Sequence, residues 1–137
     1  MSAKRKPLRK IVVEGVTYLW KVEHDHLALP PDPSQGVGGS RCREVFTAFL
    51  EGYHASPVRI RFPDGVGQSS GYPQAGVVWT SGSSGLDVNL NTPRVAAGLI
   101  RIALSRGWTP GQSKSPMVVE DGFFLLAELP AESPPKA

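Results

Sequence analysis

The chain has 137 residues, of which 40% are hydrophobic and 20% are charged, a composition typical of one globular domain. Its single cysteine, Cys42, excludes an intramolecular disulfide, so the class of small disulfide-bonded secreted proteins is not expected. No apolar run approaches the roughly 18 residues that cross a bilayer, and no apolar segment follows the basic start of the chain as a secretory signal requires. We expect a cytoplasmic protein that has no membrane partner.

The formal net charge of +3 comes from the start of the chain. Its first ten residues contain no acidic group and five basic ones: Lys4, Arg5, Lys6, Arg9 and Lys10. We therefore expect residues 1–10 to form a basic flexible tail, residues 11–129 one domain, and residues 130–137 a disordered Pro-rich tail. A tail of this kind either keeps the protein soluble or attracts nucleic acid in a salt-sensitive way.

Alternating apolar residues predict strands through the first half of the chain. Residues 9–26 predict a hairpin with its turn at Glu14-Gly15, in which Tyr18, Trp20, Val22 and His24 share one face. Residues 43–53 predict the next strand, and after a turn at 54–56 residues 57–62 predict another. In that strand Val58, Ile60 and Phe62 point inward, while Arg59 and Arg61 point outward. Residues 77–80 and 86–91 predict two shorter strands.

The segment "TPRVAAGLIRIALSRGWTP" predicts an amphipathic helix over about 93–106. Thr92 is a suitable N-cap, Pro93 suits the first helical position, and Gly107 suits the residue that ends the helix. A strand is predicted on either side of this helix, unlike the arrangement around a DNA-recognition helix. The helix should therefore cover a sheet, with Arg94, Gly98, Arg101 and Ser105 on its outer face.

Residues 122–129, "GFFLLAEL", have apolar side chains at alternate positions on both faces, which predicts a central strand. The predicted order is therefore ββββ(β)βαβ. Runs of strands with one helix indicate an α+β fold. We expect a single antiparallel sheet of five to seven strands with the helix packed on one face.

His24, Asp25 and His26 form the most distinctive group of polar residues. Because residues two apart on a strand point the same way, the two histidines can share a metal ion. Cys42 or His54 would be a further ligand, and Asp25 an outer partner. General acid–base use and a plain surface role are the alternatives. No C-x-x-C or H-E-x-x-H motif accompanies them, so no metal ion, cofactor or catalytic residue is assigned.

Arg59 and Arg61 on an exposed strand face are candidates for binding a carboxylate or phosphate. The alternative is a solvated face with salt bridges to Glu44 or Glu51. The surplus of aromatic residues suggests a partly exposed binding face opposite the helix. These aromatic residues are Tyr18, Trp20, Phe49, Tyr53 and Trp79.

Two other segments are candidates for a functional role. Residues 67–71 match G-x-S-x-G, but Tyr72-Pro73 prevents the helix that a nucleophile elbow needs, so a loop of small polar residues is favoured. The loops 27–41 and 63–76 should lie together at the end that carries His24, if the first four strands form a meander. Loops of this length are uncommon without a function.

Two stretches resemble a group of small bacterial proteins that has no assigned activity. They are Tyr18-x-Trp20-x-Val22, and the late pattern from Thr92-Pro93 through Ala103-Leu104 to Gly107-Trp108-x-Pro110. The resemblance covers about a quarter of the chain and implies a bacterial, cytoplasmic source. It carries over no functional residue.

The sequence favours a non-enzymatic protein-interaction module of the accessory or immunity type, or a homodimer. Binding would use the exposed sheet face or the two-loop end. The alternatives are a nucleic-acid-associated protein that uses its basic tail, and a small-ligand or metal-binding protein that uses His24, Asp25 and His26.

Overall fold

Four antiparallel strands form a meander at the centre of the computed structural model, which describes residues 8–28, 40–63, 68–70, 77–80 and 87–129. The strands are β1 (Arg9–Val13), β2 (Val16–Ala28), β3 (Ser40–Leu50) and β4 (Tyr53–Pro63). The predicted hairpin is confirmed. Its turn has positive φ at both Glu14 (51°) and Gly15 (81°), as a type I′ hairpin turn requires.

The next turn differs from the prediction. It lies at Glu51-Gly52, where Gly52 has a φ of 86°, and residues 54–56 belong to β4. Only glycine adopts such a φ readily, so Gly52 determines where the turn lies. The register of β3 with β4 shifts between Ala48 and Leu50. Residues 54–56, which were expected to form the turn, therefore lie in β4 where its pairing with β3 is irregular.

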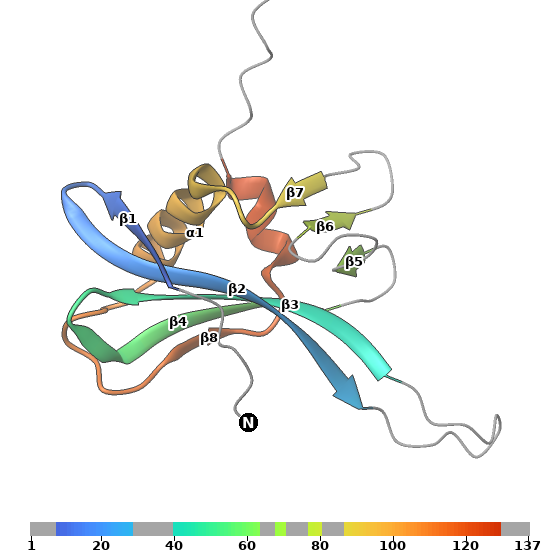
Figure 1. Cartoon of the computed structure of the whole chain (residues 1–137), viewed down its shortest axis with the longest axis horizontal. Helices are drawn as coiled ribbons and strands as arrows, with labels where there is room; N and C mark the ends of the chain where they lie inside the picture. Colours follow the sequence, from blue (N-terminus) through green and yellow to red (C-terminus); the bar gives the residue numbers. More distant parts are fainter. Residues whose placement is uncertain (1–7, 29–39, 64–67, 71–76, 81–86, 130–137) are drawn as a thin grey trace, which may run out of the picture.

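A short strand near the end of the described chain completes the main sheet. β8 (Met117–Val119) pairs in parallel with β4, which gives the order β1-β2-β3-β4-β8. A separate antiparallel sheet contains β5 (Gln68–Ser70), β6 (Val77–Thr80) and β7 (Asp87–Asn89). The α+β class is confirmed, but the main sheet is mixed and the later strands form a second sheet. Figure 1 shows this small sheet on the same side of the main sheet as the helix.

The predicted helix is confirmed as α1 (Pro93–Ser105). The Thr92 hydroxyl accepts a hydrogen bond from the Val95 amide at 3.4 Å, and Gly107 follows the helix with a φ of 104°. The Trp108 amide then donates to the Ala103 carbonyl at 3.0 Å. This hydrogen bond satisfies one of the carbonyl groups left without a partner at the C-terminal end of the helix. Gly98, expected on the outer face, is buried, as is Ile102.

The predicted strand over 122–129 is wrong, because these residues form the 3₁₀ helix η1 (Gly122–Glu128). The Asp121 carboxylate accepts from the Phe123 amide at 3.1 Å and begins the helix. Phe123, Leu125 and Leu126 are buried, whereas Phe124 is exposed. A short apolar run does not by itself distinguish a buried strand from a buried helical turn.

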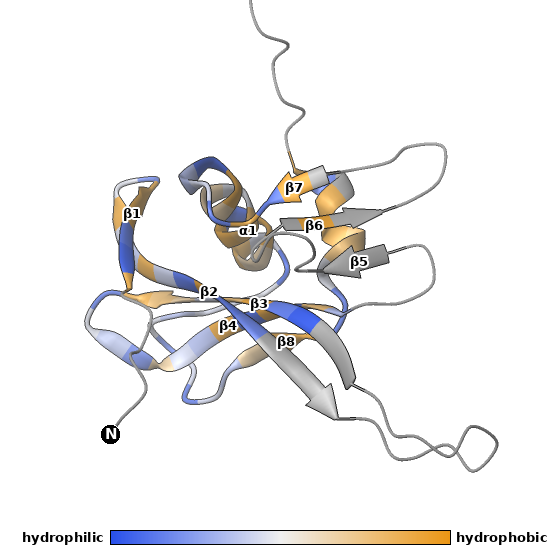
Figure 2. Cartoon of the chain, turned by 45° about the vertical axis from the view of Figure 1, so that its right-hand side comes forward, coloured by the Kyte–Doolittle hydropathy of each residue, from blue (hydrophilic) through white to orange (hydrophobic). Residues whose placement is uncertain are grey.

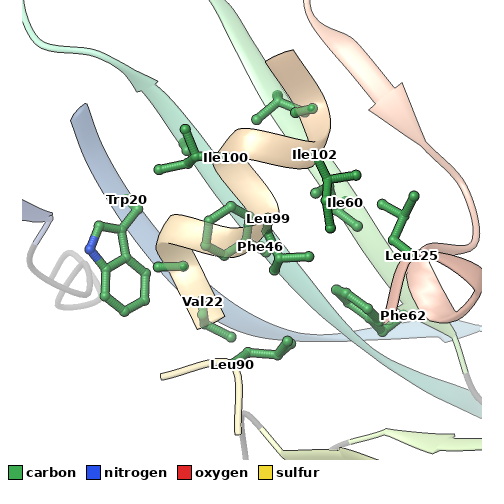
Figure 3. Close-up of a cluster of buried hydrophobic side chains, with 14 of the residues drawn as sticks. Trp20, Val22, Phe46, Ile60, Phe62, Leu90, Leu99, Ile100, Ile102 and Leu125 are labelled. Carbon is green, nitrogen blue, oxygen red and sulfur yellow. The ribbon is translucent and has the colours of Figure 1, made fainter. Parts of the chain in front are cut away.

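The core lies between the meander, α1 and η1. Figure 3 shows Trp20, Phe46, Ile60 and Phe62 of the sheet gathered around Leu99 and Ile100 of α1 and Leu125 of η1. The apolar residues of α1 turn toward the sheet (Figure 2). Burial of each such side chain contributes about 1.5–3 kcal/mol relative to exposure, so the helix acts as a lid over the sheet, as expected.

We expect Gly122→Ala to destabilise the fold by about 1–3 kcal/mol through overpacking. An added Cβ would overlap Ile60 Cγ2 and lie 2.8 Å from the Phe62 ring, and both residues are fully buried. Gly111→Ala is the matched control, because its Cβ would meet Leu50 at 3.3 Å. Denaturant unfolding measures both variants, and equal losses would contradict this packing argument.

Tyr18 gives the stability an alkaline pH dependence. Burial, and secondly the charge of Glu14, raise the pKa of Tyr18 above its ordinary 10.0. Above about pH 10 the unfolded chain therefore releases this proton while the folded chain still holds it, so the free energy of unfolding should fall as the pH rises. The fall should be shallower in Tyr18→Phe. Parallel pH profiles of the two proteins in denaturant titrations would refute this assignment.

Candidate functional site

His24 and Glu44 form a buried polar pair on the helix side of the main sheet. They are directly opposite in the β2–β3 register. His24 Nδ1 is hydrogen-bonded to Glu44 Oε1, and the Glu44 side chain is fully buried whereas a quarter of the His24 side chain is exposed. A charged carboxylate costs free energy to bury unless it is hydrogen-bonded or paired. Glu44 is the only charged residue among the buried residues of the described part, and this marks the pair as the first candidate site.

The other residues of the predicted histidine group lie one and two positions further along β2. Asp25 is opposite Arg43, and His26 is opposite Cys42. The side chains of Asp25, His26 and Cys42 lie outside the described part. His54 is excluded from this site, because its ring packs against Phe49 at 4.3 Å. Phe49 is five residues along β3 from Glu44, roughly 16 Å at the rise of a strand.

Metal-ligating groups of three or more His, Cys, Asp or Glu residues are not found among the described side chains. That set includes His24 and Glu44 but not His26 or Cys42. The described part therefore provides one imidazole and one carboxylate, and the backbone register brings two further positions next to them.

The two arginines of β4 lie on the opposite face of the sheet. Arg59 is exposed, and Arg61 Nη1 donates to Glu120 Oε1 at 2.7 Å. Neither acid considered from the sequence is the partner of Arg61, since Glu44 is buried on the helix side and Glu51 pairs with Lys10 at 3.0 Å. The pairing with Glu120 depends on β8, which the sequence did not predict.

The expected aromatic binding face is not present among the described residues. Trp20 is 1% exposed and lies in the core, so its prediction as a binding residue is wrong. Its side chain is on the face of β2 that α1 covers. Phe49 does lie on the other face but is 8% exposed. The Trp79 side chain lies outside the described part, so its predicted role stays a prediction.

Two cations of the predicted basic tail belong to the sheet, because β1 begins at Arg9. Arg9 Nη1 donates to the Asn91 carbonyl at 2.6 Å, and the guanidinium lies 4.4 Å from the centre of the Trp20 ring. Lys10 pairs with Glu51. These contacts leave Lys4, Arg5 and Lys6 of the predicted nucleic-acid tail, which are outside the described residues.

The loop predictions fall mostly outside the described residues, which omit 29–39, 64–67 and 71–76. The meander on which the two-loop end depends is confirmed. The middle of the G-x-S-x-G match, Gln68–Ser70, forms β5 and pairs with β6. It is therefore not the turn between a strand and a helix that a nucleophile elbow needs.

The β1–β2 hairpin is a second candidate surface, which sequence reasoning missed. Five large hydrophobic residues are exposed in the described part, and three of them belong to or adjoin this hairpin: Leu8, Val12 and Val16. Val12 is 63% exposed, the most of the five. Neighbouring residues of a strand point to opposite faces, so the sequence Val12-Val13 was the signal that one of the two valines would be exposed when the other is buried.

The comparisons with known proteins do not assign either surface. No protein-family model, no curated protein and no solved structure gives a significant match to the chain. Among the described residues, no helix has the length and apolarity needed to cross a membrane.

The hydrogen bond between His24 and Glu44 should contribute to the stability of the fold. We expect His24→Leu to lower the free energy of unfolding by about 1–3 kcal/mol, because it removes a hydrogen bond to a buried carboxylate. His24→Leu, Glu44→Gln and the double variant form a thermodynamic cycle in denaturant unfolding. Losses that add within about 0.5 kcal/mol would mean that the two side chains are not coupled. Lys21→Leu, which breaks the more exposed pair with Glu23, is the control and should cost much less.

Proposed function

We propose that the chain is a small protein-interaction module that binds a second copy of itself by pairing β1 with β1. The observation that carries the proposal is an edge strand whose most exposed residue is aliphatic: β1 ends the main sheet, and Val12 is 63% exposed on it. An edge strand presents backbone N–H and C=O groups that a further strand can pair with. Exposed aliphatic side chains beside them lose contact with water when it does so.

The other edge of the sheet is less suited to pairing. β8 has three residues, and Pro116, which lacks an N–H, stands before it. Short edge strands and prolines are common protections against pairing. β1 has five residues and continues directly into the long strand β2 through a tight turn. The geometry therefore favours β1 over β8 as the edge that binds.

An antiparallel pairing of two copies centred on Val12 matches the side chains of β1 with each other. Val12 would lie opposite Val12, and Ile11 opposite Val13 of the other copy. Because Val13 and Val16 flank the two-residue turn, Val13 directs its hydrogen bonds toward β2. Lys10 and Val12 then direct theirs toward the free edge.

The centre of the sheet face opposite α1 is a weaker candidate for binding. Thr47 and Phe49, in the middle of that face, are buried. The charged side chains of Lys10, Lys21 and Arg61 on the same face are engaged in ion pairs. The sequence resemblance supports a bacterial cytoplasmic setting, in which such a dimer would serve as an accessory or immunity-type factor.

The test is the molar mass in solution, measured by light scattering across a range of protein concentrations. We expect the unaltered chain to reach the mass of a dimer and Val12→Lys to remain a monomer, because lysine would place two positive charges opposite each other. Val118→Lys is the matched control: Val118 is also exposed, on the other edge strand, and this variant should dimerise normally.

Hydrogen exchange gives a second measurement. In the dimer the amides of Lys10 and Val12 should become more protected as the protein concentration rises. A monomer at every concentration, or loss of the dimer in both lysine variants, would overturn the proposal.

A further inference from the structure

The free edge of β1 includes a lysine that should oppose pairing with a second copy. Lys10 and Val12 are the two residues of β1 whose backbone N–H and C=O groups point toward the free edge. Lysine on an edge strand is a common protection against edge-to-edge pairing, because its charge is costly to remove from water and repels the same charge on another chain. Lys10 is therefore compatible with a dimer only if its charge is compensated within its own chain.

Glu51 compensates this charge from two strands away. Lys10 Nζ lies 3.0 Å from Glu51 Oε2. Glu51 belongs to the turn between β3 and β4, and its amide donates to the Thr17 carbonyl at 3.1 Å, which holds the turn beside β2. In the β1–β2 register Thr17 is opposite Val12, and Leu19 is opposite Lys10. The ion pair therefore crosses β2 on the sheet face opposite α1.

The position of Glu51 determines the direction that the Lys10 side chain takes. Because the strand order is β1-β2-β3, Glu51 lies on the side of Lys10 that is away from the free edge. The Lys10 side chain is 71% exposed, so packing contributes little to holding it and the ion pair is what directs it. The ammonium group is then drawn over β2, and the edge presents the exposed Val12 beside backbone groups that a second strand can pair with.

We propose that Glu51 is a positioning residue of the β1–β1 interface. It draws the charge of Lys10 away from the edge and so allows a second copy to pair there. This inference rests on the proposed dimer and adds the residue that makes an edge with a lysine competent to bind. Glu51 acts through Lys10, since it comes from the β3–β4 turn rather than from the edge strand.

The test is the dissociation constant of the dimer, measured on the full chain by light scattering over a range of protein concentrations. Glu51→Gln should weaken the dimer about 3- to 10-fold, a modest effect because exposed ion pairs are individually weak. Lys10→Gln should dimerise at least as tightly as the unaltered chain. The double variant should recover the affinity of Lys10→Gln, which it would not do if Glu51 served only to shape its turn.

Ionic strength provides a second measurement. Salt screens the interaction between exposed charges, and Glu51→Gln leaves one uncompensated ammonium group beside the interface in each copy. Raising the salt concentration should therefore tighten the dimer of Glu51→Gln more than the dimer of the unaltered chain. An equal response of the two proteins would contradict the role of charge at this edge.

Glu23→Gln is the matched control. It breaks the ion pair of Lys21 with Glu23 at 2.9 Å, which lies on the same face of the sheet but on β2, and it should leave the dimer unchanged. Circular dichroism checks that each variant is folded. If Glu51→Gln does not fold, Lys10→Gln still decides the question, because a weaker dimer in that variant would be the opposite of the expected result.

The outcomes separate this role from the dimer itself. A monomeric unaltered chain at every concentration would overturn both the dimer and the role of Glu51. A dimer with the same dissociation constant in Glu51→Gln as in the unaltered chain, or one that the double variant does not restore, would overturn the role of Glu51 alone.

Discussion

Packing of α1 and η1 against one face of the meander is the interaction on which the other features depend. The sheet contributes large side chains such as Trp20, Phe46 and Phe62, and the two helices contribute Leu99, Ile100 and Leu125. Since only one face is covered in this way, the two faces of each strand have different roles. Residues on the covered face must be apolar or paired, and this requirement makes a buried carboxylate on that face notable.

Local signals predicted the elements whose conformation is determined locally. Thr92, Pro93 and Gly107 defined both ends of α1 because capping depends on neighbouring residues. Alternation predicted the inward residues of β4 for the same reason. The strand predicted over residues 122–129 is wrong because a short apolar run is compatible with either a strand or a helical turn until its surroundings are known. Gly122 lies against Ile60 and Phe62, a contact between distant parts of the chain.

The candidate sites show the same difference between features that depend on neighbouring residues and features that depend on distant ones. His24 was identified from its own strand, whereas its partner Glu44 was not, because the pairing depends on the register of β2 with β3 across residues 29–39. Trp20 was assigned to an exposed face because alternation shows which residues share a face but not which face is covered. The exposed edge at Val12 followed from the order of the strands, which no single segment contains.

The position of η1 has a consequence for synthesis of the protein. Its buried residues Phe123, Leu125 and Leu126 follow every strand and α1 in the chain. In the order of synthesis the meander and α1 precede η1, and Phe62 lacks its edge-to-face neighbour Phe123 until η1 is made. The last described element is therefore the one that completes the apolar core.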